Sequence, residues 1–394
     1  MPDKLTAPPP PPHETDWDPA SPDVHRDQRA AYDAMRERCP VARSAPAQWT
    51  VFGHADVGRV IRDHNTFSSV VSTRVAVPNG MDPPEHTLYR DIVDRYFTTA
   101  LVEAFEDSCR EIAAAGIREA VATGRVDLMA SLALPFAARV QCAYLGWPID
   151  MHRDLIAWLA RNRAAILARD RAALDAAAAD LTLMVRQLID ARRSTPTDAP
   201  RDLTDALTRE TAHGRPLDLD TMVSILRNWT VGEIGTIASS VGIIAEFLAR
   251  HPAWQDRLRQ EPSLLPEAID EVLRIHGPLV SNRRVTTREV QVGARTLPAG
   301  AAVTINWISA NRDPRVFEAP DEFRLGRNRD DNLLYGDGIH VCPGAGLARM
   351  ELRVITEELL RATREIALVA DTPPALADPP ASGFSSLPVR LTPA

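Results

Sequence analysis

A glycine-rich loop around Cys342 constrains the fold of this chain more than any other feature. The segment LLYGDGIHVCPGAGLARMELRV (residues 333–354) holds the cysteine and then opens into a predicted helix. Glycines frame the cysteine on both sides, at Gly336, Gly338, Gly344 and Gly346. Glycine lets a backbone approach a flat macrocycle closely, and N–H groups near a helix start stabilise a thiolate. The loop therefore fits a metal-binding thiolate, although a buried cysteine in a turn is the common alternative.

The same segment resembles the haem-binding loop of the cytochrome P450 superfamily, whose pattern is F-x-x-G-x-x-x-C-x-G. The glycines and Cys342 are in place, and His340 precedes the cysteine by two residues, as it often does in the family. Tyr335 stands where phenylalanine is usual. The resemblance implies that Cys342 is the axial ligand of the iron of haem b, with Gly344 in the cofactor site. A thiolate on haem iron pushes electron density that favours O–O cleavage.

Two further segments match the ion-pair cluster of this family. EAIDEVLRIHGP contains Glu271-x-x-Arg274, the family's E-x-x-R, and FEAPDEFRLGR supplies Arg327. Positions i and i+3 of a helix share a face, so Glu271 and Arg274 can form a charge-assisted pair that Arg327 joins. We expect this cluster to serve folding and haem retention, whereas an isolated E-x-x-R is usually an ordinary surface pair.

Cationic residues are predicted to bind the haem propionates. The segment DPPEHTLYR places His86 and Arg90 four residues apart on one helical face, and Arg284 precedes the predicted strands. The resemblance implies that all three contact a propionate, and His340 is a further candidate. An otherwise apolar haem site needs cations that form charge-assisted bonds with two carboxylates.

The longest predicted helix, residues 218–249, resembles the oxygen-activating helix of the family, which usually reads [A/G]-G-x-[D/E]-T. Counting back from EFLARHP without a gap places Thr236 at the threonine and Gly232 at the alanine or glycine, whereas the other register would put Gly235 at the threonine. Small residues let such a helix open beside the iron, and the threonine hydroxyl orients the water chain that delivers protons. The resemblance therefore implies a catalytic role for Thr236.

The acid that usually precedes the threonine is missing in this register, because Gly235 replaces it. Glu233, three residues before Thr236, shares a helix face with it and could point into the oxygen pocket. We consider three roles for Glu233: a relocated proton donor, a contact to a basic or hydroxylated substrate group, or a glutamate satisfied by solvent or a salt bridge.

The same register predicts the residues that face the substrate. They are Asn228, Val231 and Gly232 on the long helix, and Leu279, Val280 and Asn282 after the E-x-x-R helix. The loop at residues 68–81 should form the distal wall, and its Val, Ser and Thr residues describe a mixed pocket. Arg74 and Arg283 could pair a substrate carboxylate, but exposed arginine is the favoured interpretation. The sequence does not name the substrate.

Hydrophobic periodicity predicts a mainly α fold with small β-sheets. We expect helices at residues 27–43, 55–64, 218–249 and 264–275 and in several pieces across 101–189, strands at 48–54 and across 284–306, and a loop at 194–202. The resemblance implies the cytochrome P450 fold, with haem between the long oxygen-activating helix and the helix after Cys342. We further expect a disordered proline-rich leader at residues 1–20 and a single catalytic domain at residues 21–394.

Charge and cysteine usage exclude several classes of protein. The 45 Lys and Arg residues against 53 Asp and Glu residues give a net charge of −8, without the basic excess of a duplex-binding domain. The four cysteines are scattered without a CxxC pair, and the N-terminal segment shows neither a signal peptide nor an apolar anchor. We expect a cytoplasmic protein that binds neither nucleic acid nor a membrane.

The resemblance leads to a hypothesis of function, a soluble bacterial-type haem-thiolate monooxygenase that inserts one atom of O2 into a small organic substrate. The chain ends about 50 residues after Cys342. Electrons are therefore expected from a separate ferredoxin and ferredoxin reductase, which would dock near Arg349 and Arg353. A peroxide-driven peroxygenase, which would have little need of Thr236, and a non-enzymatic haem sensor or carrier are the alternatives.

Overall fold

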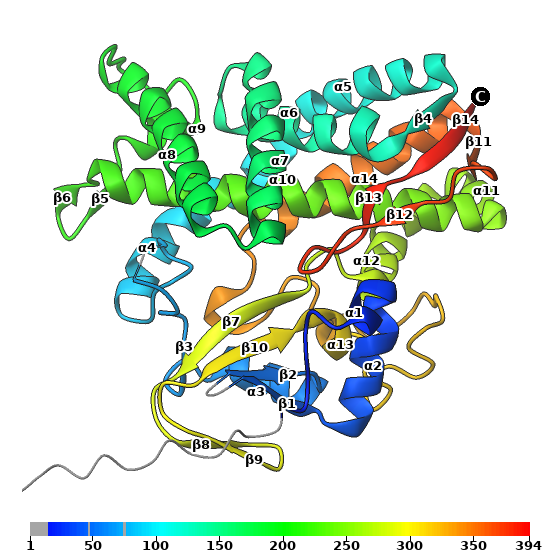
Figure 1. The fold of residues 1–394 in the computed structure, drawn as a ribbon. Coiled ribbons are helices and arrows are strands. Elements are labelled where there is room, and N and C mark those ends of the chain that lie inside the picture. The colour runs from blue at the N-terminus through cyan, green and yellow to red at the C-terminus, as the bar shows by residue number, and fades with distance from the viewer. Residues whose placement is uncertain (1–14, 46–47, 74–75) are drawn as a thin grey trace, which may run out of the picture.

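The computed structural model describes residues 15–45, 48–73 and 76–394 (Figure 1). Residues 1–14 of the predicted leader, and Arg74, lie outside the described residues. Residues 15–20, which we assigned to the leader, belong to the fold instead, because the buried Trp17 ring packs edge-on against Phe52 with ring centroids 5.3 Å apart. The prediction was wrong here because one buried tryptophan, and no periodic pattern, holds these residues.

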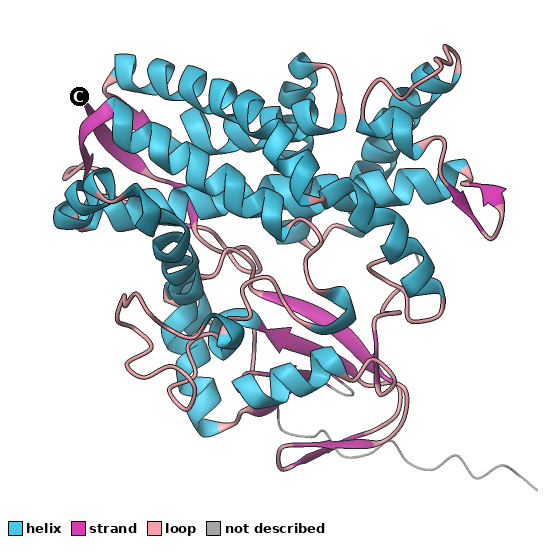
Figure 2. Cartoon of the chain, turned by 180° about the vertical axis from the view of Figure 1, so that it is seen from behind, coloured by secondary structure: helices cyan, strands magenta, loops and turns pink. Residues whose placement is uncertain are grey.

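Helices make up most of the described chain (Figure 2). They are α1 (Pro22–Arg26), α2 (Gln28–Arg38), α3 (His54–Arg62), α4 (Glu85–Asp94), α5 (Thr99–Thr123), α6 (Leu134–Leu145), α7 (His152–Ala168), α8 (Arg171–Arg193), α9 (Leu203–Leu207), α10 (Leu219–Arg250), α11 (Pro252–Gln260), α12 (Leu265–His276), α13 (Trp307–Ala310) and α14 (Ala345–Ala362). The predicted helices across 101–189 correspond to α5 to α8, and those at 55–64 and 264–275 correspond to α3 and α12, so these predictions are confirmed.

The strands are short and form small sheets. They are β1 (Val41–Ala45), β2 (Gln48–Val51), β3 (Phe67–Ser68), β4 (Arg125–Asp127), β5 (Thr211–Ala212), β6 (Arg215–Pro216), β7 (Ser281–Thr286), β8 (Val290–Val292), β9 (Arg295–Leu297), β10 (Ala302–Asn306), β11 (Thr363–Leu368), β12 (Ala375–Leu376), β13 (Phe384–Ser386) and β14 (Pro388–Pro393). The largest sheet has the order β1-β2-β10-β7-β3, in which β10 runs parallel to β2 and antiparallel to β7. The strands predicted across 284–306 are therefore confirmed as β7 to β10.

The long helix α10 runs through the middle of the helical part and packs against α6, α8, α12 and α14 (Figure 1). Its start is fixed by the Asp218 side chain, which accepts a hydrogen bond from the Thr221 N–H. The helix is long and apolar enough to cross a membrane by length and composition, yet 72% of its most apolar window is buried inside the protein. This burial is that of a core helix, and the predicted span of 218–249 is confirmed.

The predicted helix at residues 27–43 is too long. The α2 helix ends at Arg38, because Pro40 disfavours the helical conformation for the residue before it and supplies no N–H of its own. The chain then enters β1, which pairs antiparallel with β2. Strand pairing therefore replaces the last part of the predicted helix.

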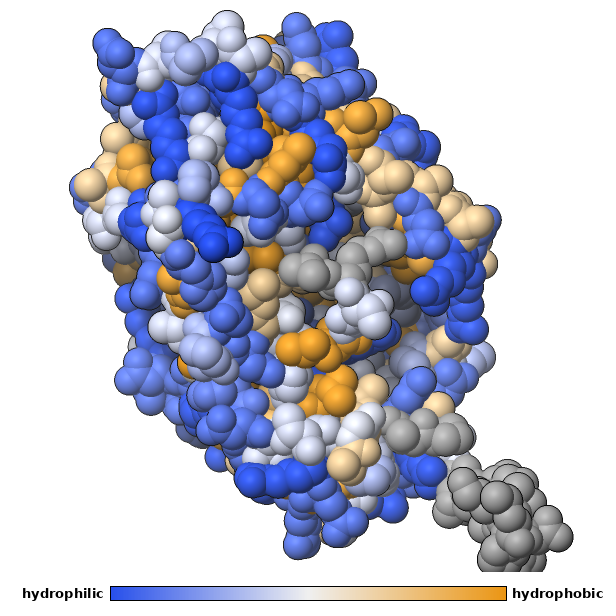
Figure 3. All heavy atoms as spheres, turned by 90° about the vertical axis from the view of Figure 1, so that its left-hand side faces the viewer, coloured by the Kyte–Doolittle hydropathy of each residue, from blue (hydrophilic) through white to orange (hydrophobic). Residues whose placement is uncertain are grey.

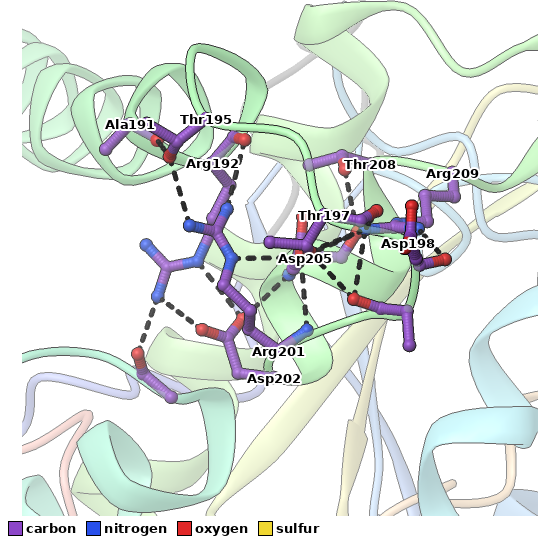
Figure 4. A network of polar contacts seen from close by, with 12 residues as sticks. Ala191, Arg192, Thr195, Thr197, Asp198, Arg201, Asp202, Asp205, Thr208 and Arg209 are labelled. Atoms are coloured by element: carbon purple, nitrogen blue, oxygen red, sulfur yellow. Dashed lines mark hydrogen bonds and ion pairs between the residues drawn. The ribbon is translucent and has the colours of Figure 1, made fainter.

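The predicted loop at residues 194–202 is confirmed, and polar contacts hold it between α8 and α9 (Figure 4). Arg192 donates from Nε to Asp202 Oδ1 at 3.1 Å and from Nη2 to Asp202 Oδ2 at 3.0 Å. Arg201 and Arg209 both reach Asp205 Oδ2, at 3.2 and 3.3 Å. These ion pairs fix the connection that carries the chain from α8 toward the start of α10.

Candidate active site

The loop that carries Cys342 is held by backbone hydrogen bonds ahead of α14. The Cys342 N–H donates to the Tyr335 carbonyl oxygen at 2.8 Å, and Gly344 is the N-cap of α14. Burial raises the pKa of the Cys342 thiol, whereas the Gly344 N–H, which donates to the sulfur, lowers it. Gly338 has φ +68, and a Cβ there would lie 2.9 Å from the Ile61 carbonyl oxygen, so this position requires glycine.

A cavity of about 270 Å³ lies between α10 and the Cys342 loop. The α10 side chains Glu233 and Thr236 line it, together with Cys342 from the opposite side. The face at the left of Figure 1 is hollowed, and apolar residues gather beside the hollow (Figure 3). The thiol and the residues of the predicted oxygen-activating segment therefore share one chamber.

Cations and imidazoles gather where propionate contacts are predicted. The His86 and His340 rings meet edge-on with centroids 4.3 Å apart, and His340 Nε2 shares a hydrogen bond with Ser69 Oγ at 2.8 Å. His86 Nε2 is buried and has no hydrogen-bond partner among the described residues. Burial, together with the neighbouring His86 and Arg284, lowers the pKa of His340 to about 3. Burial also lowers the pKa of His86, and its unpartnered Nε2 would donate to an added anion in the tautomer that carries the proton there.

The two arginines of this region have different partners. Arg284 is buried, its Nη1 donates to the Arg283 carbonyl oxygen at 2.8 Å, and desolvation lowers its pKa. Arg90 instead bonds Asp94 and donates from Nη1 to the carbonyl oxygens of Ile339 and Val341, at 3.1 and 2.7 Å. Arg284, which is buried without an ion pair to the described residues, and His86, whose Nε2 has no partner among them, fit the carboxylates of a haem. Arg90 braces the Cys342 loop.

The Thr236 hydroxyl donates within α10, to the Gly232 carbonyl oxygen at 2.7 Å and to that of Glu233 at 3.1 Å. One turn later Ser240 Oγ donates to the Thr236 carbonyl oxygen at 2.8 Å. Side-chain bonds of this kind compete with the helix ladder and loosen it locally. The cavity thus faces a stretch of α10 whose hydroxyl groups can exchange partners.

Glu233 meets two groups that sequence reasoning missed. Gln141 of α6, in the amide orientation that satisfies its neighbours, donates to both carboxyl oxygens of Glu233, at 3.1 and 2.5 Å. The Glu351 carboxyl of α14 contacts Glu233 from the other side. The sequence does carry a signal for Glu351, because it stands on the apolar stripe of α14 between the buried Leu347 and Ile355.

Four of the predicted substrate contacts line the cavity: Asn228, Gly232, Leu279 and Asn282. Asn228 also ties the distal loop to α10, since its Nδ2 donates to the Val77 carbonyl oxygen at 3.0 Å while Ser224 Oγ accepts from the Val77 N–H at 2.9 Å. The loop contributes Asn79 to the lining. The distal wall therefore lies along α10.

Two predicted substrate contacts are wrong. Val231 is 51% exposed and lies outside the lining, because adjacent helix positions differ by about 100° and Gly232 takes the inward direction. Val280 is buried in a separate core cluster with Ile308, since successive side chains leading into a strand point to opposite sides and Leu279 faces the cavity. Arg283 is exposed, as the favoured interpretation had it.

The predicted ion-pair cluster is confirmed. Glu271 receives Arg274 through two bonds, at 2.7 and 2.9 Å, and Arg327 Nε at 2.8 Å. Arg274 is 1% exposed and also donates to the carbonyl oxygens of Asn311 and Pro320, at 2.7 and 2.9 Å. The cluster thereby connects α12 to the segment that leads to the Cys342 loop.

Comparisons with known proteins bear on this arrangement. Residues 147–364 match the family model described as Cytochrome P450. Cyclomarin C epoxidase CymV of Salinispora arenicola is 33% identical, and the match covers 82% of this chain and 86% of that protein. Erythromycin C-12 hydroxylase of Saccharopolyspora erythraea is 31% identical over 83% of this chain and 84% of its own. A solved structure of a mutant of P450 EryK in complex with erythromycin B has a TM-score of 0.85 at 28% identity, covering 93% of this chain and 96% of that one.

Proposed function

Since this chain belongs to the cytochrome P450 family and is a haem-thiolate monooxygenase of small molecules, we propose that it oxidises a secondary metabolite by inserting one atom of O2. One observation carries the proposal: Thr236 and Glu233 of α10 line the same cavity as the Cys342 sulfur. Relatives whose names specify an epoxidation of cyclomarin C and a C-12 hydroxylation of erythromycin support the substrate class.

Bound haem would supply the redox centre for O2 activation, with Cys342 as its thiolate ligand. His86 and Arg284 would hold the propionates, because they are the buried donors with free capacity. Thr236 would hold a cavity water by turning its hydroxyl from the Gly232 carbonyl, and Glu233 one turn earlier would supply its proton. Leu279 and Asn282 would contact the substrate.

We propose that a separate ferredoxin and its reductase supply the electrons in the cytoplasm. Of the two arginines expected at the docking face, Arg353 is bound by Glu106 and Glu357, at 2.5 and 3.0 Å. Arg349 is 47% exposed, although it pairs with Asp270 at 3.1 Å. Arg349 is therefore the stronger candidate for a contact with an acidic ferredoxin.

The function is tested by a spectral screen of secondary metabolites for a substrate-induced shift of the Soret band, followed by turnover with a surrogate ferredoxin and reductase. Under ¹⁸O2 we expect one labelled oxygen atom in the product. Product that forms only with added hydrogen peroxide and carries no label from O2 would instead establish the peroxygenase. A shift of the Soret band without product under either condition would instead indicate a non-enzymatic haem sensor or carrier.

The Thr236→Ala variant should consume electrons without matching product formation. Loss of the hydroxyl removes the group that holds the proton-delivering water, and positioned acid–base groups contribute about 10²–10⁴-fold to rate. We expect product per electron pair to fall about tenfold or more and hydrogen peroxide to accumulate. The measurement is product, peroxide and NADPH in one assay, with Thr236→Ser as the control that keeps the hydroxyl and much of the coupling. Unchanged coupling in Thr236→Ala would refute the role.

A further inference from the structure

Glu351 is a buried acid without an ordinary partner. Its side chain is 0% exposed on α14, and neither carboxyl oxygen has a hydrogen-bond donor among the described residues. Buried carboxylates are normally paired with a cation or with several N–H groups. The other buried acid of α14, Glu358, follows that rule, because it pairs with Arg110 at 3.0 Å and with Arg361. Glu351 therefore requires an explanation of its own.

The group in contact with Glu351 is a second carboxyl, that of Glu233 on α10. Both line the cavity, and they are the acids of its described lining. Gln141 donates to Glu233 from the far side and is itself fully buried. Two carboxylates can only accept, so a proton between them is the donor that satisfies both.

The surroundings of the pair offer no compensating cation. The titratable groups that face it are Cys109 of α5, Cys142 and Tyr144 of α6, and Tyr335 and Cys342 of the cysteine loop. No Lys, Arg or His of the described chain contributes to the pKa of either acid. Two adjacent carboxyl groups in a buried site without a cation cannot both be ionised, and other carboxyl dyads share one proton for the same reason.

We propose, resting on the monooxygenase function above, that Glu233 and Glu351 share one proton at neutral pH and that Glu351 is the positioning residue that keeps this proton at the cavity wall near Thr236. Gly235 supplies no acid next to Thr236. The proton is therefore bound by Glu233, one turn earlier on α10, and Glu351 of α14 holds it in place. In delivery, the O–H bond of Glu233 breaks and its proton passes to a cavity water. The resulting pair of carboxylates then takes up a proton from solvent water.

The direct test is infrared spectroscopy of the haem-loaded protein at pH 7. We expect a carboxylic acid C=O band that shifts in D2O, and we expect Glu351→Gln to abolish it, because the amide introduced by this substitution donates to Glu233 and leaves that group ionised. The matched control is Glu357→Gln on the same helix, where Arg110 and Arg353 pair with the acid and the band should remain. A wild-type protein without the band, or a band that survives Glu351→Gln, overturns the proposal.

The pH dependence gives a second readout. Burial raises the pKa of Glu233, although its bond with Glu351 lowers it, and burial together with Glu233 raises the pKa of Glu351. The pair binds more protons folded than unfolded above the ordinary glutamate pKa of about 4.3. The stability this provides is present at low pH and is lost as pH rises through the raised pKa of the pair. The wild-type melting temperature should therefore fall more steeply between pH 5 and pH 8 than that of Glu351→Gln.

Activity separates this proposal from the function on which it rests. Glu351→Gln should lower kcat and raise the solvent isotope effect severalfold, while the spectral Kd for substrate barely changes. If no variant, wild type included, oxidises a substrate, the function fails while the infrared result still decides the pair. If the wild type oxidises its substrate but lacks the band, the pair fails and the function stands.

Discussion

Glu271→Ala should yield little folded, haem-loaded protein. The substitution removes the carboxylate that receives both Arg274 and Arg327, and it leaves Arg274, which is buried, without a counter-charge. Breaking a buried ion network by removing one partner costs about 3–5 kcal/mol, a large share of a typical stability of about 5–15 kcal/mol. The measurement is haem content per polypeptide together with the thermal unfolding midpoint.

An exposed acid beside the same cluster gives the control. Glu318 pairs with Arg324 at 3.8 Å and is almost fully exposed, so Glu318→Ala should change stability by about 0–1 kcal/mol. Glu271→Gln keeps the shape of the side chain and removes its charge, and it should lie close to the alanine variant. Normal haem content and melting in Glu271→Ala would show that the cluster does not hold the fold.

Cys342→Ser should lose the spectroscopic signature of thiolate ligation completely. The reduced carbon monoxide complex of the wild type should show a red-shifted Soret band, since a soft thiolate donates electron density to the iron. Serine keeps the size of the side chain but lacks that donor, and monooxygenase turnover should vanish with the band. Cys39 is half-buried at the end of α2, remote from the cavity lining. Cys39→Ser should therefore keep both properties, and a Cys342→Ser protein that retained the band would end the assignment.

Much of the fold follows from the sequence, because its dominant signals are local. The span of α10 follows from its apolar periodicity and its Asp218 cap, and the contact of Glu271 with Arg274 follows from their i, i+3 spacing. The position of Arg327 in that cluster followed from the family resemblance. No local rule connects residues more than 50 positions apart.

The rest depends on tertiary contacts that no local pattern encodes. Glu351 meets Glu233 only because α14 packs against α10, and Trp17 is buried only because Phe52 lies opposite. Arg90 shares a helical face with His86, yet its guanidinium bonds the backbone of the cysteine loop. Spacing predicted the face correctly in this case, and the shape of the neighbouring loop determined the partner.

The double attachment of Val77 sets a limit on how the protein admits its substrate. Ser224 accepts from the N–H of Val77 and Asn228 donates to its carbonyl oxygen, and the two side chains come from successive turns of α10. Swinging this part of the distal loop outward would require both bonds to break together, so it forms a fixed rim. On the preceding side of the loop Val70 and Val71 lie exposed and carry no such attachment to α10 among the described residues. The position of Val77 relative to α10 should therefore be the same with and without a bound substrate.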